Sequence, residues 1–117
     1  MNLKLLSKGN VLVFGDIILD RYISGTVDRV SPEAPVPVLK PSDEDIRLGG
    51  AANVAVNLSS LGSKATLIGV TGKDVSSDQV RVLLEQNKIR NALSKSVNPT
   101  ISKLRFLAGQ QQLIRID

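Results

Sequence analysis

The sequence predicts an α/β fold built on a parallel sheet, and three observations indicate it. Short apolar runs such as Val11–Phe14 and Ala65–Val70 suit strands that are buried on both faces. Helical apolar patterns alternate with these runs along the chain, as they do in βαβ units. The 117 residues are 42% hydrophobic and 22% charged, which is typical of one globular domain and not of a disordered chain.

The first strand is predicted over Val11–Phe14, because this apolar run ends at Gly15 and Asp16. Residues 21–48 are predicted to be irregular, since their apolar residues are isolated and four of the five prolines lie among them. Within this stretch, residues 35–41 alternate and are rich in proline. That composition excludes a central strand but allows an edge strand or a clasp.

A helix is predicted after Gly49 and Gly50, because apolar residues then recur at steps of three and four. Gly62 is expected to end this helix, as a glycine commonly does at the position after a C-cap. The second buried strand is predicted over Ala65–Val70 and ends before Gly72. This order of elements is the one expected for a parallel sheet.

The spacing of residues 76–79 (SSDQ) predicts a capping box, followed by a helix whose apolar face includes Leu84. A third strand is predicted over residues 89–93. Beyond Pro99 the pattern alternates, and a turn at residues 108–110 predicts a hairpin with a polar, basic face. Only two helices are predicted, although a parallel sheet needs cover on both faces, so we expect part of a larger domain.

The composition excludes several kinds of chemistry. The chain has no cysteine and no histidine, which rules out a Ser-His-Asp triad, a cysteine nucleophile and zinc or iron–sulfur sites of the usual ligands. No apolar run is long enough to span a bilayer and no signal peptide is evident, so a soluble cytoplasmic protein without a membrane partner is expected. Three aromatic residues are too few for a nucleic-acid stacking platform.

Two groups of residues are candidates for a ligand site. Gly49 and Gly50 precede a helix of small residues, which would let a ligand approach the backbone and the helix N-terminus, with Asn53 in the first turn. The alternative is a tight turn packed on the sheet. Asp16 and Asp20 follow the first strand, at the edge where α/β sheets bind ligands, and they could accept hydrogen bonds from sugar hydroxyls or simply cap the loop.

A third group is basic. Lys103 and Arg105 share one face of the predicted hairpin, where they are either surface charges or, over a pocket, contacts to phosphate. The last 37 residues carry seven basic and two acidic side chains, which suits a small anionic ligand. Residues 69–74 superficially suggest a phosphate loop, but Asp74 stands where serine or threonine is needed, so a strand end and turn are predicted there.

The glycine segment 49–55 (GGAANVA), followed by Gly62 and Gly72, resembles the N-terminal signature of the ribokinase-like, PfkB-type carbohydrate kinases. Other segments are similar to the branch of this family that phosphorylates D-glycero-β-D-manno-heptose 7-phosphate and that is often fused to an ADP-heptose synthase domain. These segments are residues 29–38 (RVSPEAPVPV), 99–105 (PTISKLR) and 111–117 (QQLIRID). The resemblance covers the chain from about Val11 to Asp117.

The resemblance implies a Rossmann-like αβα sandwich with a lid of β-strands, here residues 21–48 and 98–117. Lids pair between subunits in many members of this family, so a homo-oligomer formed through the lid strands is expected. The implied reaction moves the γ-phosphate of ATP, with Mg²⁺, to the C1 hydroxyl of the phosphorylated sugar. The product would be the 1,7-bisphosphate, on the route to ADP-heptose and the lipopolysaccharide core.

The resemblance also implies a set of substrate-binding residues. They are Asp20, Gly49, Gly50, Asn53, Lys103, Arg105 and Gln112. Two departures stand beside this set. Gly109 replaces a basic residue expected at the lid turn, and the family's Gly-Ala-Gly-Asp anion hole and catalytic aspartate match nothing in these residues.

No catalytic or metal-binding residue is therefore assigned in this chain. Residues 1–117 are expected to be the N-terminal, substrate-side part of a sugar kinase, without its C-terminal catalytic half, inactive alone and without strong binding of ATP or Mg²⁺. Two alternatives stay open. One is a kinase of the same family for another sugar or a nucleoside, and the other is a non-catalytic binding or dimerisation module.

Overall fold

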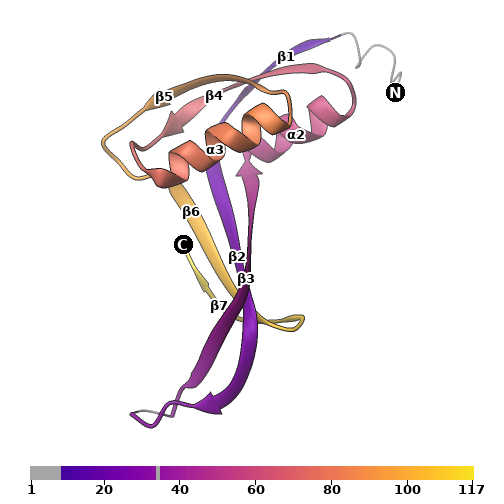
Figure 1. The fold of residues 1–117 in the computed structure, drawn as a ribbon. Coiled ribbons are helices and arrows are strands. Elements are labelled where there is room, and N and C mark those ends of the chain that lie inside the picture. Colours follow the sequence, from indigo (N-terminus) through magenta and orange to yellow (C-terminus); the bar gives the residue numbers. More distant parts are fainter. Residues whose placement is uncertain (1–8, 34) are drawn as a thin grey trace. The chain divides into compact units, whose positions relative to one another are not determined.

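The computed structural model describes residues 9–33 and 35–117 of the chain (Figure 1). Strands and helices alternate as the α/β prediction requires, so that fold class is confirmed. In chain order the elements are β1 (Asn10–Phe14), β2 (Ile17–Val30), β3 (Pro37–Gly50), α2 (Ala51–Ser60), β4 (Lys64–Thr71), α3 (Val75–Gln86), β5 (Arg90–Lys95), β6 (Ile101–Ala108) and β7 (Gln111–Ile116).

The chain divides into two compact units. Unit 1 contains residues 9–19 together with Arg47–Ser102, and unit 2 contains Asp20–Ile46 together with Lys103–Asp117. Each unit is built around its own strands. The parallel strands and both helices belong to unit 1, and most of the residues of β2, β3, β6 and β7 belong to unit 2.

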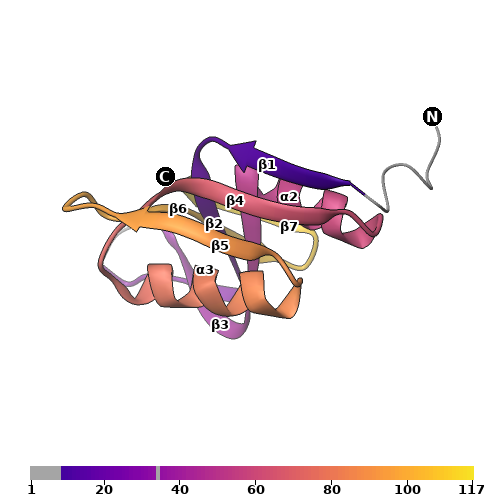
Figure 2. The same cartoon turned by 90° about the horizontal axis from the view of Figure 1, so that it is seen from above.

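Unit 1 is a three-stranded parallel sheet in the order β1-β4-β5 (Figure 2). Helix α2 packs on β1 and β4, and α3 packs on β5. Both connections step in the same direction across the sheet, and right-handed crossovers then put both helices on one face. The buried apolar side chains of the strands and helices form the core there: Val13, Ala65, Leu67, Ala52, Ala55, Val80 and Leu84.

The opposite face of this sheet is apolar and uncovered within the described residues. Side chains alternate along a strand, so Leu12 and Phe14 of β1 point away from the face that holds Val13. Leu12 is 60% exposed and Phe14 is 68% exposed, and Val70 of β4 is also exposed. Parallel sheets usually have both faces buried. Within the described residues, this sheet therefore carries helices on one face only.

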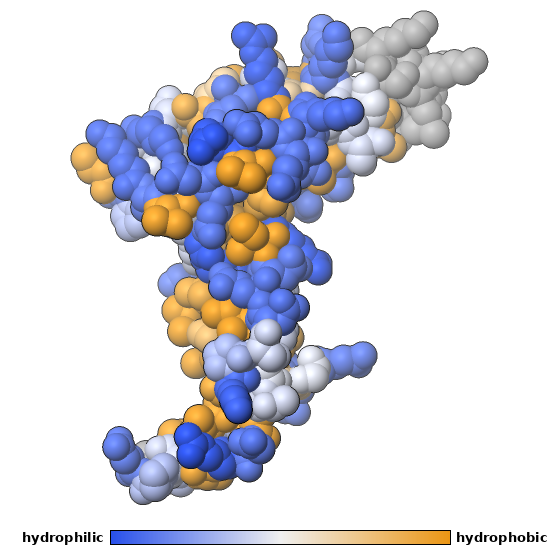
Figure 3. Space-filling view, in the orientation of Figure 1, coloured by the Kyte–Doolittle hydropathy of each residue, from blue (hydrophilic) through white to orange (hydrophobic). Residues whose placement is uncertain are grey.

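The strands of unit 2 belong to a four-stranded sheet in the order β3-β2-β6-β7. Strands β6 and β7 pair in antiparallel fashion around a tight turn, and Gly109 of that turn has a φ of 62°. This confirms the predicted hairpin. Exposed apolar atoms gather along these strands in the space-filling view (Figure 3).

The prediction that residues 21–48 are irregular is wrong, because β2 and β3 are 14 residues long each. Few of their side chains between Arg21 and Ile46 are buried, so no clean alternation of apolar and polar residues was available to reveal them. The narrower prediction of an edge strand is confirmed. Strand β3 is an edge of its sheet and holds Pro37 and Pro41.

The start of α3 also differs from the prediction. The helix begins at Val75 with Asp74 as its N-cap, two residues earlier than the start predicted from the capping-box spacing of residues 76–79. The carboxylate of Asp74 accepts a hydrogen bond of 2.8 Å from the backbone N–H of Ser77. Asp74 thus pairs one of the backbone N–H groups that have no partner within the first turn of a helix.

The end of α2 follows the prediction. Leu61 is its C-cap, and Gly62 follows with a φ of 93°. Among the described helices, none has the length and apolar character needed to cross a membrane.

Candidate functional site

In unit 1 the predicted glycine turn runs against the loop that follows β1. The backbone N–H of Ala51 donates a 2.8 Å hydrogen bond to the carbonyl of Asp16. Gly50 has a φ of 61°, and a Cβ placed on it would lie 2.4 Å from the same carbonyl oxygen. Only glycine fits this close approach in this conformation. The packing alternative therefore accounts for Gly50 by itself, and a ligand is not needed to explain it.

The first turn of α2 keeps the features of an anion-binding helix end. Gly50 is the N-cap and makes no side-chain cap, so no capping side chain competes for the N–H groups that follow Ala51, whose own N–H is bonded to Asp16. Gly49 is buried and Asn53 is exposed on the first turn. No acidic residue lies in that turn. The three predicted residues of this group thus lie together at one helix start, with one side chain open to a ligand.

A cavity of about 260 Å³ opens at the carboxyl ends of β1 and β4, the edge where α/β sheets bind ligands. Its polar lining includes Asp16, Thr71 and Asn98, all of unit 1. None of the seven predicted substrate-binding residues lines it. Of the two aspartates considered from the sequence, the structure brings Asp16 to this cavity.

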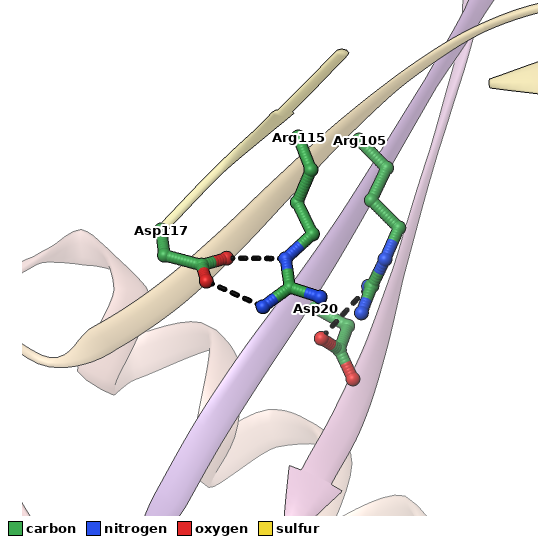
Figure 4. A network of polar contacts seen from close by, with 4 residues as sticks. All are labelled: Asp20, Arg105, Arg115 and Asp117. Carbon is green, nitrogen blue, oxygen red and sulfur yellow. Dashed lines mark hydrogen bonds and ion pairs between the residues drawn. The ribbon is translucent and has the colours of Figure 1, made fainter. Parts of the chain in front are cut away.

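In unit 2 the structure brings two predicted residues into direct contact. Arg105 of β6 donates a 3.0 Å hydrogen bond to the carboxylate of Asp20 of β2 (Figure 4). Their side chains are only 19% and 17% exposed. The Arg105 guanidinium also lies over the ring of Tyr22, 5.0 Å from its centroid. A shielded ion pair with a cation–π contact holds this arginine in one orientation.

A second ion pair stands beside the first. Arg115 donates to both carboxylate oxygens of Asp117, at 2.9 Å from Nε and 2.6 Å from Nη2. Hydrogen bonding to Arg115 lowers the pKa of Asp117 below its ordinary value, and the positive charges of Lys103 and Arg105 act in the same direction. Hydrogen bonding to Asp117 raises the pKa of Arg115. Figure 4 shows the side chains of both arginines pointing toward Asp20.

The register of the hairpin explains which side chains share this face. Arg105 pairs with Arg115, and Leu107 pairs with Gln112, because the register shifts by one residue between Phe106 and Leu107. Residues paired across antiparallel strands point to the same side. Lys103 lies two residues before Arg105 and therefore shares its face. Gln112 and Lys103 thus join the face that holds the two arginines.

The predicted substrate-binding residues therefore fall into two sets. Gly49, Gly50 and Asn53 lie together in unit 1. Asp20, Lys103, Arg105 and Gln112 lie on neighbouring strands in unit 2. The sequence did not point to Tyr22, Arg115 or Asp117 as members of the second set. A simple two-residue hairpin would place Ile114 opposite Arg105, so the register shift that aligns Arg115 gives no signal in the sequence.

The described residues do not offer a metal site of their own. Within residues 9–33 and 35–117, no three aspartate or glutamate side chains gather closely enough to hold an ion. Mg²⁺ that arrives with a nucleotide is usually held by one or two carboxylates together with the phosphates, so this finding concerns only a site made wholly of protein ligands.

Comparison with solved structures identifies the class of fold as ribokinase-like. A carbohydrate kinase from Agrobacterium tumefaciens superposes with a TM-score of 0.76 at 24% identity, covering 92% of this chain and 34% of that one. Ribokinase from Arabidopsis thaliana, solved with ribose and ATP, superposes with a TM-score of 0.72 at 18% identity. That match covers 93% of this chain and 35% of the other. The part of the fold present here is the parallel sheet with its helices and the separate set of strands.

Sequence comparison gives the family. The model of the pfkB family carbohydrate kinases matches residues 8–117, and the chain belongs to this family. It is 50% identical over 117 residues to the bifunctional protein HldE of Hydrogenovibrio crunogenus. It is 48% identical over 113 residues to the D-beta-D-heptose 7-phosphate kinase of Bordetella bronchiseptica. The chain spans 24% of the first relative and 36% of the second.

Proposed function

We propose that this chain is the substrate-side part of a kinase for D-glycero-β-D-manno-heptose 7-phosphate. One observation carries the proposal: 48% identity to a heptose 7-phosphate kinase extends over 96% of this chain. The pair of arginines in unit 2 supports it, because guanidinium groups suit the phosphate of such a sugar. The complete reaction would move the γ-phosphate of ATP to the C1 hydroxyl and yield the 1,7-bisphosphate for ADP-heptose and lipopolysaccharide biosynthesis.

The contribution of these residues to that reaction is binding and orientation. In phosphoryl transfer, fixing the acceptor in line with the phosphate supplies much of the rate enhancement. The carboxylate of Asp20 would accept hydrogen bonds from sugar hydroxyls, and Asn53 would donate to the sugar beside the glycine turn. Cationic and amide groups would hold the distal phosphate. The full proposed set is Asp20, Gly49, Gly50, Asn53, Lys103, Arg105 and Gln112.

The catalytic base and the ATP cleft are proposed to lie outside residues 1–117. The chain spans only 36% of the heptose 7-phosphate kinase of Bordetella bronchiseptica, and no segment in it matches the family's anion hole. ATP with Mg²⁺ would supply the transferred phosphoryl group in the complete enzyme, and we expect neither to bind these residues tightly. Because the reaction consumes ATP, we expect the proposed enzyme to act in the cytoplasm.

Two measurements on the 117-residue chain test the proposal. Calorimetry should give tighter binding of heptose 7-phosphate than of fructose 6-phosphate, ribose or adenosine. Preference for a sugar or nucleoside without a distal phosphate would favour a different kinase of the family. Incubation with ATP, Mg²⁺ and heptose 7-phosphate should give no product. Turnover at the rate of an intact sugar kinase would contradict the assignment of the catalytic half to other residues.

A second role, self-association through the strands of unit 2, is favoured by the edge strand β7. Ile114 is 53% exposed on that strand, which presents an unpaired backbone edge in its sheet. Light scattering should therefore report a dimer or larger species. The variant Ile114→Lys should shift it toward the monomer, and Val97→Lys, at an exposed apolar residue of unit 1, should not. A strict monomer at all concentrations would exclude both this role and a dimerisation module.

A further inference from the structure

The hairpin of unit 2 places two positive charges directly opposite each other. Arg105 and Arg115 are register partners on antiparallel strands, and Lys103 shares their face. Like charges in such a position destabilise a sheet unless something of opposite charge lies between them. Two carboxylates, Asp20 and Asp117, are the partners that the structure provides. Three cations thus face two anions, which leaves the face with a net positive charge.

The two arginines are held very differently. Arg105 is largely shielded, paired with Asp20 on another strand and stacked over Tyr22. The Arg115–Asp117 pair is formed two residues apart along the chain, and its side chains are 47% and 48% exposed. An exposed ion pair of this kind contributes little to stability, because solvent screens it. Arg115 can therefore leave its carboxylate with little loss, whereas Arg105 cannot.

The same pair has the geometry that a phosphate would use. Arg115 presents two parallel N–H groups to the two oxygens of Asp117. A phosphate monoester offers the same two-oxygen edge with a higher charge. Lys103 and Arg105 lie on the same face of the hairpin, and their charges help to lower the pKa of Asp117. An anion in that place would therefore lie in a field of three positive charges.

We propose that Arg115 is a phosphate-binding residue of this site and that Asp117 occupies its guanidinium until a phosphorylated sugar replaces the carboxylate. This inference rests on the proposed function for its substrate class, and it adds a residue and a competing carboxylate to that function. Asp117 acts as an internal substitute for the ligand phosphate. Its removal should therefore strengthen phosphate binding, while removal of Arg115 should weaken it.

The test is calorimetric titration of the 117-residue chain with heptose 7-phosphate and with the same heptose lacking the phosphate. Arg115→Gln should weaken binding of the phosphorylated sugar roughly tenfold, since a charge-assisted bidentate contact is lost, and should leave the unphosphorylated sugar unchanged. Asp117→Asn should strengthen binding of the phosphorylated sugar by about threefold, because an exposed ion pair no longer competes.

Matched controls come from the exposed pair Arg81–Glu85 on α3. Arg81→Gln and Glu85→Gln make the same changes of net charge in unit 1, and each should alter affinity by less than about twofold, since neither group faces the ligand. If Asp117→Asn weakens binding together with Arg115→Gln, the pair is structural and the inference is wrong. If Arg115→Gln has no effect while heptose 7-phosphate still binds, the inference fails and the proposed function stands.

Titrations with fructose 6-phosphate and with inorganic phosphate distinguish failure of the heptose assignment from failure of the inference about Arg115. If the chain prefers fructose 6-phosphate and the two variants still shift its affinity in opposite directions, the inference holds and the heptose assignment is wrong. If neither sugar phosphate nor inorganic phosphate binds the parent chain, the inference is overturned.

Discussion

At Gly50, both the backbone conformation and the packing oppose a side chain. Its φ is 61°, and a Cβ added to it would lie 2.4 Å from the carbonyl oxygen of Asp16, so both conformation and space oppose any side chain. We expect Gly50→Ala to lower the free energy of unfolding by about 2–4 kcal/mol, combining strain and a steric clash. Urea denaturation measures it.

Gly109 provides the control for that measurement. Its φ of 62° is nearly the same, but nothing lies within 4 Å of a Cβ placed on it. Gly109→Ala should therefore reflect backbone strain alone, about 1–2 kcal/mol. Equal losses for the two variants would mean that the contact with Asp16 contributes nothing.

Asp74 links the start of α3 to the segment that leads into β6. Its carboxylate accepts from the backbone N–H of Thr100 at 2.9 Å and from the hydroxyl of Thr100 at 2.7 Å, besides capping the helix. The side-chain hydrogen bond from Thr100 is the largest influence that lowers the pKa of Asp74. The carboxylate is therefore needed in its charged form.

This lowered pKa predicts a pH dependence. Because the folded-state pKa lies below the ordinary value of 3.8, the stabilisation by Asp74 is present above about pH 4 and is lost as pH falls through the folded-state pKa. Asp74→Asn should lower the free energy of unfolding at neutral pH, and the difference from the parent chain should shrink as the carboxyl of the parent chain becomes protonated. A difference that stays constant from neutral to strongly acidic pH would contradict this account.

At the scale of elements, the sequence predicted the helices and strands that bury apolar side chains in the core. Helix α2 and strand β4 bury part of their surface in unit 1, so their apolar residues follow the helical and strand periods that burial imposes. The long strands β2 and β3 have mostly exposed or half-buried side chains and show no such period. Their existence depends on pairing with distant strands, which local patterns do not record.

The uncovered face of the parallel sheet leads to a prediction about β1. Leu12 and Phe14 expose a patch that a second layer would normally bury. We expect the chain to bind a hydrophobic dye and to associate as concentration rises. Phe14→Ser should reduce dye binding while changing the free energy of unfolding by less than about 1 kcal/mol, as exposed side chains contribute little.

Phe14→Ser has a buried counterpart on the same strand, Val13→Ser. That change should destabilise the chain strongly, because Val13 belongs to the core under α2. If Phe14→Ser is equally destabilising, Phe14 is buried in solution and the face is not free.

For the whole molecule, the family and the residues that resemble its motifs could be predicted from the sequence, since glycine spacing and proline pattern are local. The pairing of Arg105 with Asp20, 85 residues apart, and with Arg115 across a shifted register could not. These contacts depend on strand order and register, which are properties of the folded chain. The central proposal is that this chain carries the residues that bind the sugar phosphate of a heptose 7-phosphate kinase.

Amide NMR of the isotopically labelled chain, titrated with heptose 7-phosphate, tests that proposal most directly. We predict saturable shifts at Gly49, Gly50 and Asn53 of unit 1 and at Lys103 and Gln112 of unit 2, with none at the exposed residues of α3. Titration with ribose should give weaker shifts. The proposal would be contradicted if heptose 7-phosphate left both sets of amides unshifted, or if ribose saturated them at lower concentration.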